Sequence, residues 1–152
     1  MEKYLIFKVI LFSYRNYKDR CERIDAEVKR IARSTANGVS IFKAFDEITK
    51  LINEKRVYCN LKVIIDDILK QMKNKDILVM RIIDGLSLEE TSKLTGYEHS
   101  KICDILHTQA MSFYRLIIKK YCVIQLIDLV TDSKLLFNRY KQEVKKYKDR
   151  GC

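Results

Sequence analysis

The sequence has no proline among its 152 residues and only four glycines. Because proline inside a helix breaks it, the absence of proline permits long helices throughout the chain. Gly38, Gly85 and Gly96 lie where helical patterns end, which is where glycine closes a helix. With 47% hydrophobic residues, the chain can build a core and is too apolar for a disordered protein. These features predict an all-α fold.

The cysteines do not form a disulfide framework, because they are odd in number, widely spaced and never in a CxxC pair. The sequence also lacks any stretch near the roughly 18–20 apolar residues that span a bilayer. The apolar N-terminal run is short, contains Lys8, and has no small-residue cleavage site. We therefore expect free thiols, a cytoplasmic location and no membrane span.

The sequence also lacks the motifs of common enzymes. It has no glycine-rich phosphate loop, no Gly-x-Ser-x-Gly and no His-Glu-x-x-His. His99, Cys103 and His107 are spaced four residues apart on one helical segment, and three ligands in a row cannot close a tetrahedron around a metal. We expect no metal site, no cofactor and no enzymatic activity.

Positive charge is abundant, since the net charge is +10. Basic proteins favour polyanions, so the charge favours nucleic acid or an anionic membrane surface without deciding between them, and we expect DNA and no membrane as the partner. The charge is uneven, however. Residues 76–120 carry six basic and six acidic residues and are neutral, so the excess lies on either side of them.

The first 75 residues predict a long antiparallel helical hairpin. A heptad pattern predicts one long helix with a coiled-coil seam, ending at Asn37-Gly38. Ser40 is the expected N-cap of a second long helix with two apolar stripes, whose phase shifts at 53–56 through a stutter or a short break. The same seam could instead pair two chains as a homodimer. The heptad residues are Phe7, Ile10, Tyr14, Tyr17, Cys21, Ile24, Val28 and Ile31. The first stripe of the second helix consists of Phe42, Phe45, Ile48 and Ile52. The second stripe consists of Leu61, Ile64, Ile65, Ile68, Leu69 and Met72.

Residues 76–120 have the layout of a tri-helical helix-turn-helix. Asp76 is the expected cap of a helix over Ile77–Ile83, which Asp84-Gly85 ends. Ser87 and Glu90 form a capping box that starts the next helix at Leu88. Gly96 supplies the sharp turn, and the second helix of the motif begins at Glu98 or His99. The side chains expected to point inward are Leu88, Thr91, Leu94, Ile102, Ile105 and Leu106.

Residues 121–152 predict a C-terminal helical extension. The helix that contains Arg115 is expected to continue to Val130, with its apolar face buried against the N-terminal helix. Thr131-Asp132-Ser133 indicates a break with a new N-cap. A last helix over Lys134–Tyr147 then ends in a basic tail, residues 145–150.

The segment GLSLEETSKLTGYEHSKICDILH resembles the helix-turn-helix of sigma-factor region 4. The apolar pattern, the Gly-Leu-Ser-x-Glu-Glu opening and the turn glycine carry the resemblance. A long hairpin followed by this motif further resembles small transcriptional regulators of phages and prophages of Gram-positive bacteria. In such families the second helix contacts promoter DNA and some members work alongside RNA polymerase, so the resemblance implies promoter binding by the second helix here. Two positions depart from the family: Glu98 replaces the usual Ser or Thr, and Ile105 replaces a frequent Arg.

The N-terminal part of the second helix enters the major groove in this motif. Ser100 and Lys101 are the candidates for base edges, because lysine donates to guanine O6 and N7. His99 is a candidate for a base or a phosphate. The outward face also carries Cys103 and Asp104, and further candidates near the DNA backbone are Thr91, Ser92, Lys93, Arg115 and Lys119.

The sequence thus predicts a transcriptional regulator that binds double-stranded DNA. The alternative is a protein-interaction module that docks on RNA polymerase or another host protein, such as a defence nuclease; the neutral charge of residues 76–120 favours it. A weaker alternative is a membrane-surface protein that uses the basic tail.

Overall fold

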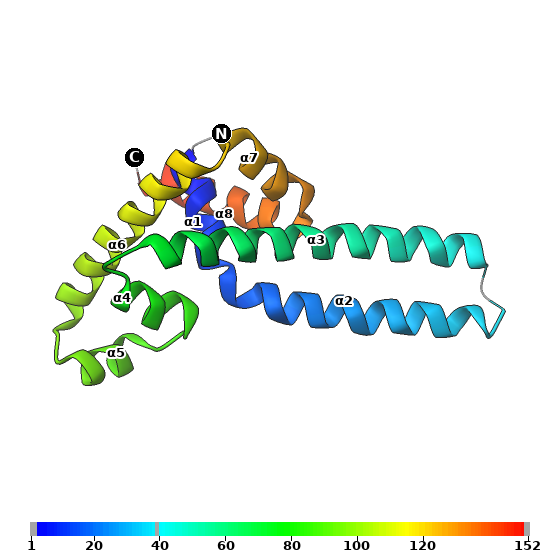
Figure 1. The fold of residues 1–152 in the computed structure, drawn as a ribbon, viewed down its shortest axis with the longest axis horizontal. Coiled ribbons are helices and arrows are strands. Elements are labelled where there is room, and N and C mark those ends of the chain that lie inside the picture. The colour runs from blue at the N-terminus through cyan, green and yellow to red at the C-terminus, as the bar shows by residue number, and fades with distance from the viewer. Residues whose placement is uncertain (1–2, 39, 151–152) are drawn as a thin grey trace.

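The computed structural model describes residues 3–38 and 40–150, which form helices and no strand (Figure 1). The all-α prediction is confirmed. The elements are α1 (Lys3–Phe12), α2 (Tyr14–Thr35), α3 (Ile41–Gln71), α4 (Asp76–Leu78), the π-helical turn η1 (Val79–Ile83), α5 (Leu88–Thr95), α6 (His99–Lys120), α7 (Val123–Asp132) and α8 (Lys134–Arg150).

Helices α2 and α3 lie side by side as an antiparallel hairpin that projects from the rest of the molecule (Figure 1). Tyr17, Ile24 and Ile31 of the heptad seam are buried in it. Ion pairs of 2.9 Å from Arg20 to Glu54 and of 2.6 Å from Lys55 to Asp25 also join the two helices. Since α3 covers the seam, the seam is not free to pair with a second chain.

The predicted single N-terminal helix is wrong, because the chain turns at Ser13 between α1 and α2. The turn is held by one contact distant in sequence and one nearby contact. The Ser13 hydroxyl accepts a 2.8 Å hydrogen bond from Arg139 of α8. The Tyr17 hydroxyl donates to the Ile10 carbonyl at 2.7 Å and so satisfies a backbone group near the turn. Phe7 and Ile10 consequently leave the hairpin seam and enter the main core.

Helix α3 runs without a break through the phase shift at 53–56. Ser40 occupies its N-cap position, although its side chain forms no capping hydrogen bond. The second stripe packs inward, with Leu61, Ile65 and Ile68 fully buried. The first stripe is largely exposed, with Phe42 and Phe45 among its exposed side chains. The phase shift therefore places the two stripes on different faces of one helix.

The predicted continuation of α6 to Val130 is also wrong, because α6 ends at Lys120 and α7 begins at Val123. Tyr121 has an extended backbone, with φ −117° and ψ 148°. Its hydroxyl donates to Asp67 of α3 at 2.6 Å, and Lys120 pairs with the same carboxylate at 2.6 Å. These hydrogen bonds lower the pKa of Asp67. The turn lets α7 pack against α1, so the expected burial of this segment on the N-terminal helix is confirmed.

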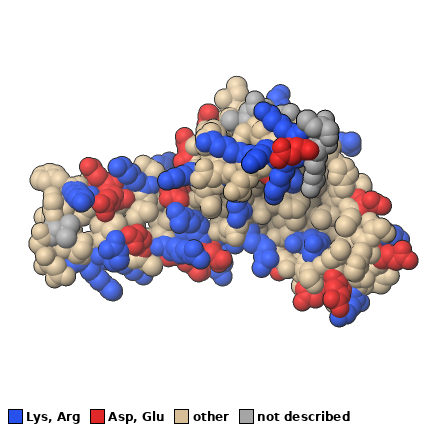
Figure 2. All heavy atoms as spheres, turned by 180° about the vertical axis from the view of Figure 1, so that it is seen from behind, with Lys and Arg blue, Asp and Glu red and all other residues tan. Residues whose placement is uncertain are grey.

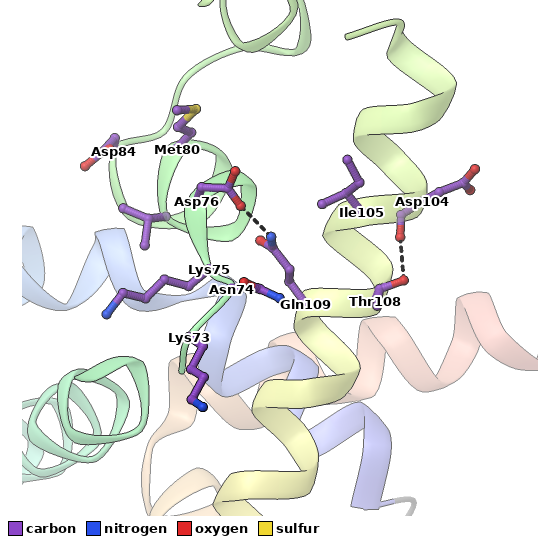
Figure 3. A pocket seen from close by; sticks show the side chains of 11 residues that line it. Lys73, Asn74, Lys75, Asp76, Met80, Asp84, Asp104, Ile105, Thr108 and Gln109 are labelled. Atoms are coloured by element: carbon purple, nitrogen blue, oxygen red, sulfur yellow. Dashed lines mark hydrogen bonds between the residues drawn. The ribbon is translucent and has the colours of Figure 1, made fainter. Parts of the chain in front are cut away.

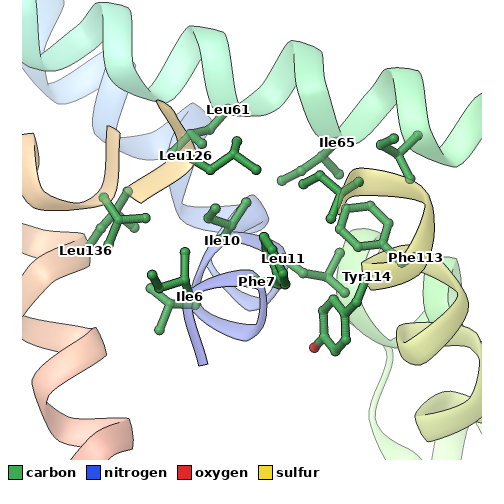
Figure 4. Close-up of a cluster of buried hydrophobic side chains, with 14 of the residues drawn as sticks. Ile6, Phe7, Ile10, Leu11, Leu61, Ile65, Phe113, Tyr114, Leu126 and Leu136 are labelled. Carbon is green, nitrogen blue, oxygen red and sulfur yellow. The ribbon is translucent and has the colours of Figure 1, made fainter. Parts of the chain in front are cut away.

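The main core surrounds α1, which is packed by α6, α7, α8 and α3 (Figure 4). Ile6, Ile10 and Leu11 of α1 are completely buried there, together with Phe113 of α6 and Leu136 of α8. Residues of all three predicted segments thus share one hydrophobic cluster. No described helix combines the length and the hydrophobicity that a membrane span requires.

The start of α8 also follows the sequence prediction. Ser133 has an extended backbone after α7. Its side-chain oxygen accepts a hydrogen bond from the Leu136 amide at 3.3 Å, as an N-cap does. The Tyr58 hydroxyl of α3 lies 3.0 Å from the same oxygen. Ser133 therefore caps α8 and links it to the hairpin.

Candidate nucleic-acid interface

The first helix of the predicted motif differs in type from the expectation. It has three α-helical residues, Asp76–Leu78, followed by the π-helical turn Val79–Ile83. Asp76 is not its N-cap, since Lys75 holds that position. Instead, the Asp76 carboxylate accepts a 2.6 Å hydrogen bond from Gln109 of α6, whose side-chain oxygen accepts from the Leu78 amide at 2.8 Å. Gln109 therefore fastens this helix to α6, a role that sequence analysis missed.

Helix α5 begins where the sequence predicted, with the capping box intact. The Glu90 amide donates to the Ser87 hydroxyl at 3.1 Å, and the Ser87 amide donates to the Glu90 carboxylate at 2.6 Å. The backbone hydrogen bond from Ser87 lowers the pKa of the Glu90 carboxyl. The box therefore stays formed at neutral pH, where Glu90 is ionised.

The turn between α5 and α6 also follows the prediction. Gly96 adopts φ +70°, a left-handed conformation that glycine reaches without steric cost. The Ser92 hydroxyl donates a 2.7 Å hydrogen bond to the Tyr97 carbonyl across the turn. Ser92, a candidate near the DNA backbone, thus uses its hydroxyl to hold the turn that orients α6.

The side chains predicted to point inward from α5 and α6 are only partly buried as expected. Thr91 and Ile102 are completely buried, as expected, whereas Leu94 is 67% exposed and does not point inward. The burial of Thr91 removes it from the candidate DNA contacts. Its hydroxyl donates to the Ser87 carbonyl at 2.8 Å inside the same helix.

The first turns of α6 are open to solvent. His99, Ser100, Lys101, Cys103 and Asp104 are all exposed. At about 100° per residue, Ser100 and Asp104 lie opposite buried Ile102, Lys101 and Cys103 lie about 80° to either side of that direction, and His99 lies nearer to the Ile102 side. The Lys101 ammonium lies 4.3 Å from the centroid of the Tyr97 ring, a cation–π contact that orients it.

The charge around these turns is mixed. Lys93 forms a 2.8 Å ion pair with Glu89, so it is not an unpaired cation. Glu98, at the N-cap of α6, and Asp104 are both exposed. The corresponding end of the molecule, at the lower right of Figure 2, shows red and blue spheres together.

The basic residues of the two chain ends do not gather around the start of α6. Figure 2 shows most of the blue surface near the centre of the molecule. Arg20 pairs with Glu54 of the hairpin, and Lys141 lies 4.3 Å from the Phe137 ring within α8. The Arg15 guanidinium lies close to Gly85, which follows η1.

Cations do extend along α6 itself. Arg115 and Lys119 are exposed and lie on the same face as Lys101. At 1.5 Å per residue, Arg115 is about 21 Å from Lys101 along the axis. Lys73, in the loop after α3, lines a pocket of about 540 Å³ together with Arg115. No local sequence pattern brings Lys73 to α6.

A second pocket, of about 800 Å³, lies between the first helix and α6 (Figure 3). Val79, Met80 and Ile105 supply its apolar side chains. Lysines and acidic residues both contribute to its rim; they are Lys73, Lys75, Asp76, Asp84 and Asp104. Its mixed charge suits a protein side chain better than a phosphate.

Within 3–38 and 40–150, no group of three or more His, Cys, Asp or Glu side chains is placed to hold a metal ion. No protein-family model, curated protein or solved structure significantly matches the chain.

Proposed function

We propose that the protein is a DNA-binding transcriptional regulator of the phage and prophage type, with a helix-turn-helix like that of sigma-factor region 4. The observation that carries the proposal is the open start of α6, held in place by the capping box at Ser87 and the left-handed turn at Gly96. The first turns of the second helix are the part that enters the major groove in this motif. They carry polar side chains that can donate to base edges.

Each candidate has a distinct role in this proposal. Ser100 and Lys101 contact bases, because both are exposed in the first turn of α6. His99, exposed at the start of the same turn, donates to a base or phosphate. Lys73, Arg115 and Lys119 contact phosphates further along α6, which positions the helix in the groove.

The test is a selection from a random duplex library, followed by binding measurements on the selected DNA at low salt. Replacing a base-contacting lysine costs about 1–3 kcal/mol, so Lys101→Ala should weaken binding to the selected site roughly 5- to 100-fold. It should weaken binding to unrelated DNA much less. Lys29→Ala is the matched control, because Lys29 is also exposed but lies on α2 of the hairpin, away from α6, and its loss should change binding little.

Two results would contradict this function. One is the absence of any enriched sequence at low salt. The other is an enriched site whose affinity is the same for Lys101→Ala, Ser100→Ala and the unmodified chain.

The second pocket supports the alternative function, docking on a protein such as RNA polymerase or a defence nuclease. An apolar floor with a mixed-charge rim is typical of a protein interface. Met80→Glu would place a charge on that floor and should abolish co-purification with the candidate partner. Lys101→Ala should leave such docking unchanged, so the two functions can be separated in one set of variants.

A further inference from the structure

The hairpin ends in an exposed apolar stripe at the beginning of α3. None of the described residues covers this end of the hairpin, which projects away from the other helices (Figure 1). Its extreme end, at the left of Figure 2, is mostly uncharged. The stripe consists of Ile41, Phe42, Phe45 and Ile52, with exposed fractions of 72%, 86%, 68% and 47%, and of half-buried Ile48.

The stripe has the spacing of a helix–helix seam. Ile41, Phe45, Ile48 and Ile52 follow one another at steps of four, three and four residues, so they form one line along α3. At about 100° per residue, this line lies roughly opposite the side that carries buried Leu61. A 4-3-4 line of large apolar side chains can pack against a second helix, and no helix within residues 3–38 and 40–150 lies against this side of α3 (Figure 1).

We propose that this stripe is a dimerisation surface, and that a second copy of the chain occupies it with the same stripe in antiparallel orientation. The stripe is self-complementary in that orientation. When Ile41 of one copy lies opposite Ile52 of the other, Phe45 lies opposite Ile48. The twofold axis then passes between residues 46 and 47, and each layer contains only apolar side chains.

The residues beside the stripe favour a second copy over a partner chosen by charge. The flanking seam positions are exposed Phe42 and Thr49 on one side, and buried Ala44 and half-buried Leu51 on the other. None of them is charged, whereas such positions carry charges when they select a different partner. Because each copy has a net charge of +10, most other surfaces of two copies would repel one another. This stripe brings two copies together without opposing like charges.

The size of the surface sets the expected affinity. A covered phenylalanine buries on the order of 150–250 Å², so the stripe buries roughly 500 Å² on each copy and about 1,000 Å² in total. That total is close to the lower limit for a specific interface. The dimer should therefore form reversibly at micromolar concentrations.

The antiparallel pairing also fixes the shape of the dimer. The axis lies about 25 residues before the end of α3, which corresponds to roughly 37 Å along the helix. The two core regions, each with its helix-turn-helix, should lie about 75 Å apart at opposite ends. A pairing through the heptad seam of α2 would give a different shape and would require the hairpin to open.

Analytical ultracentrifugation of the full chain from 1 µM to 500 µM, without DNA, tests the proposal. The sedimentation coefficient should change from that of a monomer to that of a dimer over this range. The pair-distance distribution from small-angle X-ray scattering should show a second maximum at about 75 Å. Phe45→Glu should weaken association at least about 100-fold, since it places a charge at the centre of the interface in both copies. Ile124→Glu is the matched control, because Ile124 is also 68% exposed but lies on α7, and it should leave the dimer intact.

Salt provides a second criterion that is independent of DNA binding. Added salt should tighten the dimer, because it screens the repulsion between two positively charged copies. A chain that stays monomeric at 500 µM would overturn the proposal and leave the stripe to another partner. A dimer that Phe45→Glu does not weaken would overturn the placement of the interface.

Discussion

The two projecting ends of the molecule expose opposite kinds of surface. The hairpin tip exposes phenylalanine and isoleucine side chains and few charges. The start of α6 exposes His99, Ser100 and Lys101 among residues of both charges. Apolar exposed stripes suit association with protein, and polar helix starts suit base edges. The two proposals accordingly assign association to the hairpin tip and DNA contact to the start of α6.

The two regions also differ in what determines their structure. The arrangement of α5 and α6 depends on local capping and turn residues, whereas the hairpin depends on side chains that meet across two long helices. Matched substitutions in the two regions should therefore have different effects on stability and binding.

The largest difference is expected for phenylalanine. Phe113→Ala should destabilise the chain by about 3–5 kcal/mol, because Phe113 is completely buried in the main core and its removal leaves a cavity. Phe45→Ala should cost less than about 0.5 kcal/mol at concentrations where the chain is monomeric. Chemical denaturation of both variants measures the difference. Equal costs would contradict the exposure of the hairpin tip.

A disulfide across the hairpin should have the next largest effect. The sulfur atoms of Cys21 and Cys59 lie 4.0 Å apart, so small side-chain rotations would bring them to bonding distance. With oxidised glutathione, the two thiols should be oxidised to one disulfide while glutathione is reduced. A loop of 38 residues would then be closed, which stabilises the fold by about 4 kcal/mol and raises Tm by ~10 °C.

The rate of this oxidation should rise with pH. Burial raises the pKa of the Cys21 thiol to about 11, so only a small fraction is thiolate at neutral pH. Mass spectrometry should show the loss of two hydrogens, and Cys59→Ser should prevent it. Unchanged stability after complete oxidation would show that the hairpin is not closed by this bond.

Substitutions of Gly38 and Gly96 should lower the free energy of unfolding by similar amounts but differ in their effect on DNA binding. Gly38 and Gly96 both have positive φ, and an added Cβ would meet no other atom within 4 Å at either. Gly38→Ala and Gly96→Ala should each cost about 1–2 kcal/mol from backbone strain alone. Only Gly96→Ala should also weaken DNA binding, because Gly96 orients α6. A comparable loss of DNA binding in Gly38→Ala would contradict the separation of the two regions.

The smallest effect concerns the two serine caps. Ser87→Ala removes a hydrogen bond to the Glu90 amide and should cost about 1 kcal/mol. Ser40→Ala should change the free energy of unfolding by less than about 0.5 kcal/mol, because the Ser40 side chain forms no capping bond. Thermal unfolding of the two variants distinguishes these outcomes.

The sequence predicted the features that depend on local chemistry. The capping box at Ser87, the left-handed turn at Gly96 and the start of α6 at His99 each lie where their residues placed them. Such features depend on side chains within a few residues of one another. The heptad pattern of the first 75 residues likewise predicted that Tyr17, Ile24 and Ile31 of α2 are buried.

The sequence did not predict features held by distant contacts. The turn at Ser13 depends on Arg139, 126 residues away, and the turn at Tyr121 depends on Asp67, 54 residues away. Helical periodicity continues through both turns, so no local pattern marks them. The exposure of the stripe at Phe45 was equally hidden, because periodicity identifies an apolar face without showing what covers it.

The salt dependence of DNA binding tests the location of the interface most directly. Three phosphate contacts, from Lys73, Arg115 and Lys119, predict that log K falls with log salt at a slope of about −2.7. Replacing Arg115 and Lys119 with alanine should reduce the slope to about −0.9. A slope of −6 or steeper that persists in this variant would contradict the account, because DNA would then be held by the basic surface near the centre of the molecule.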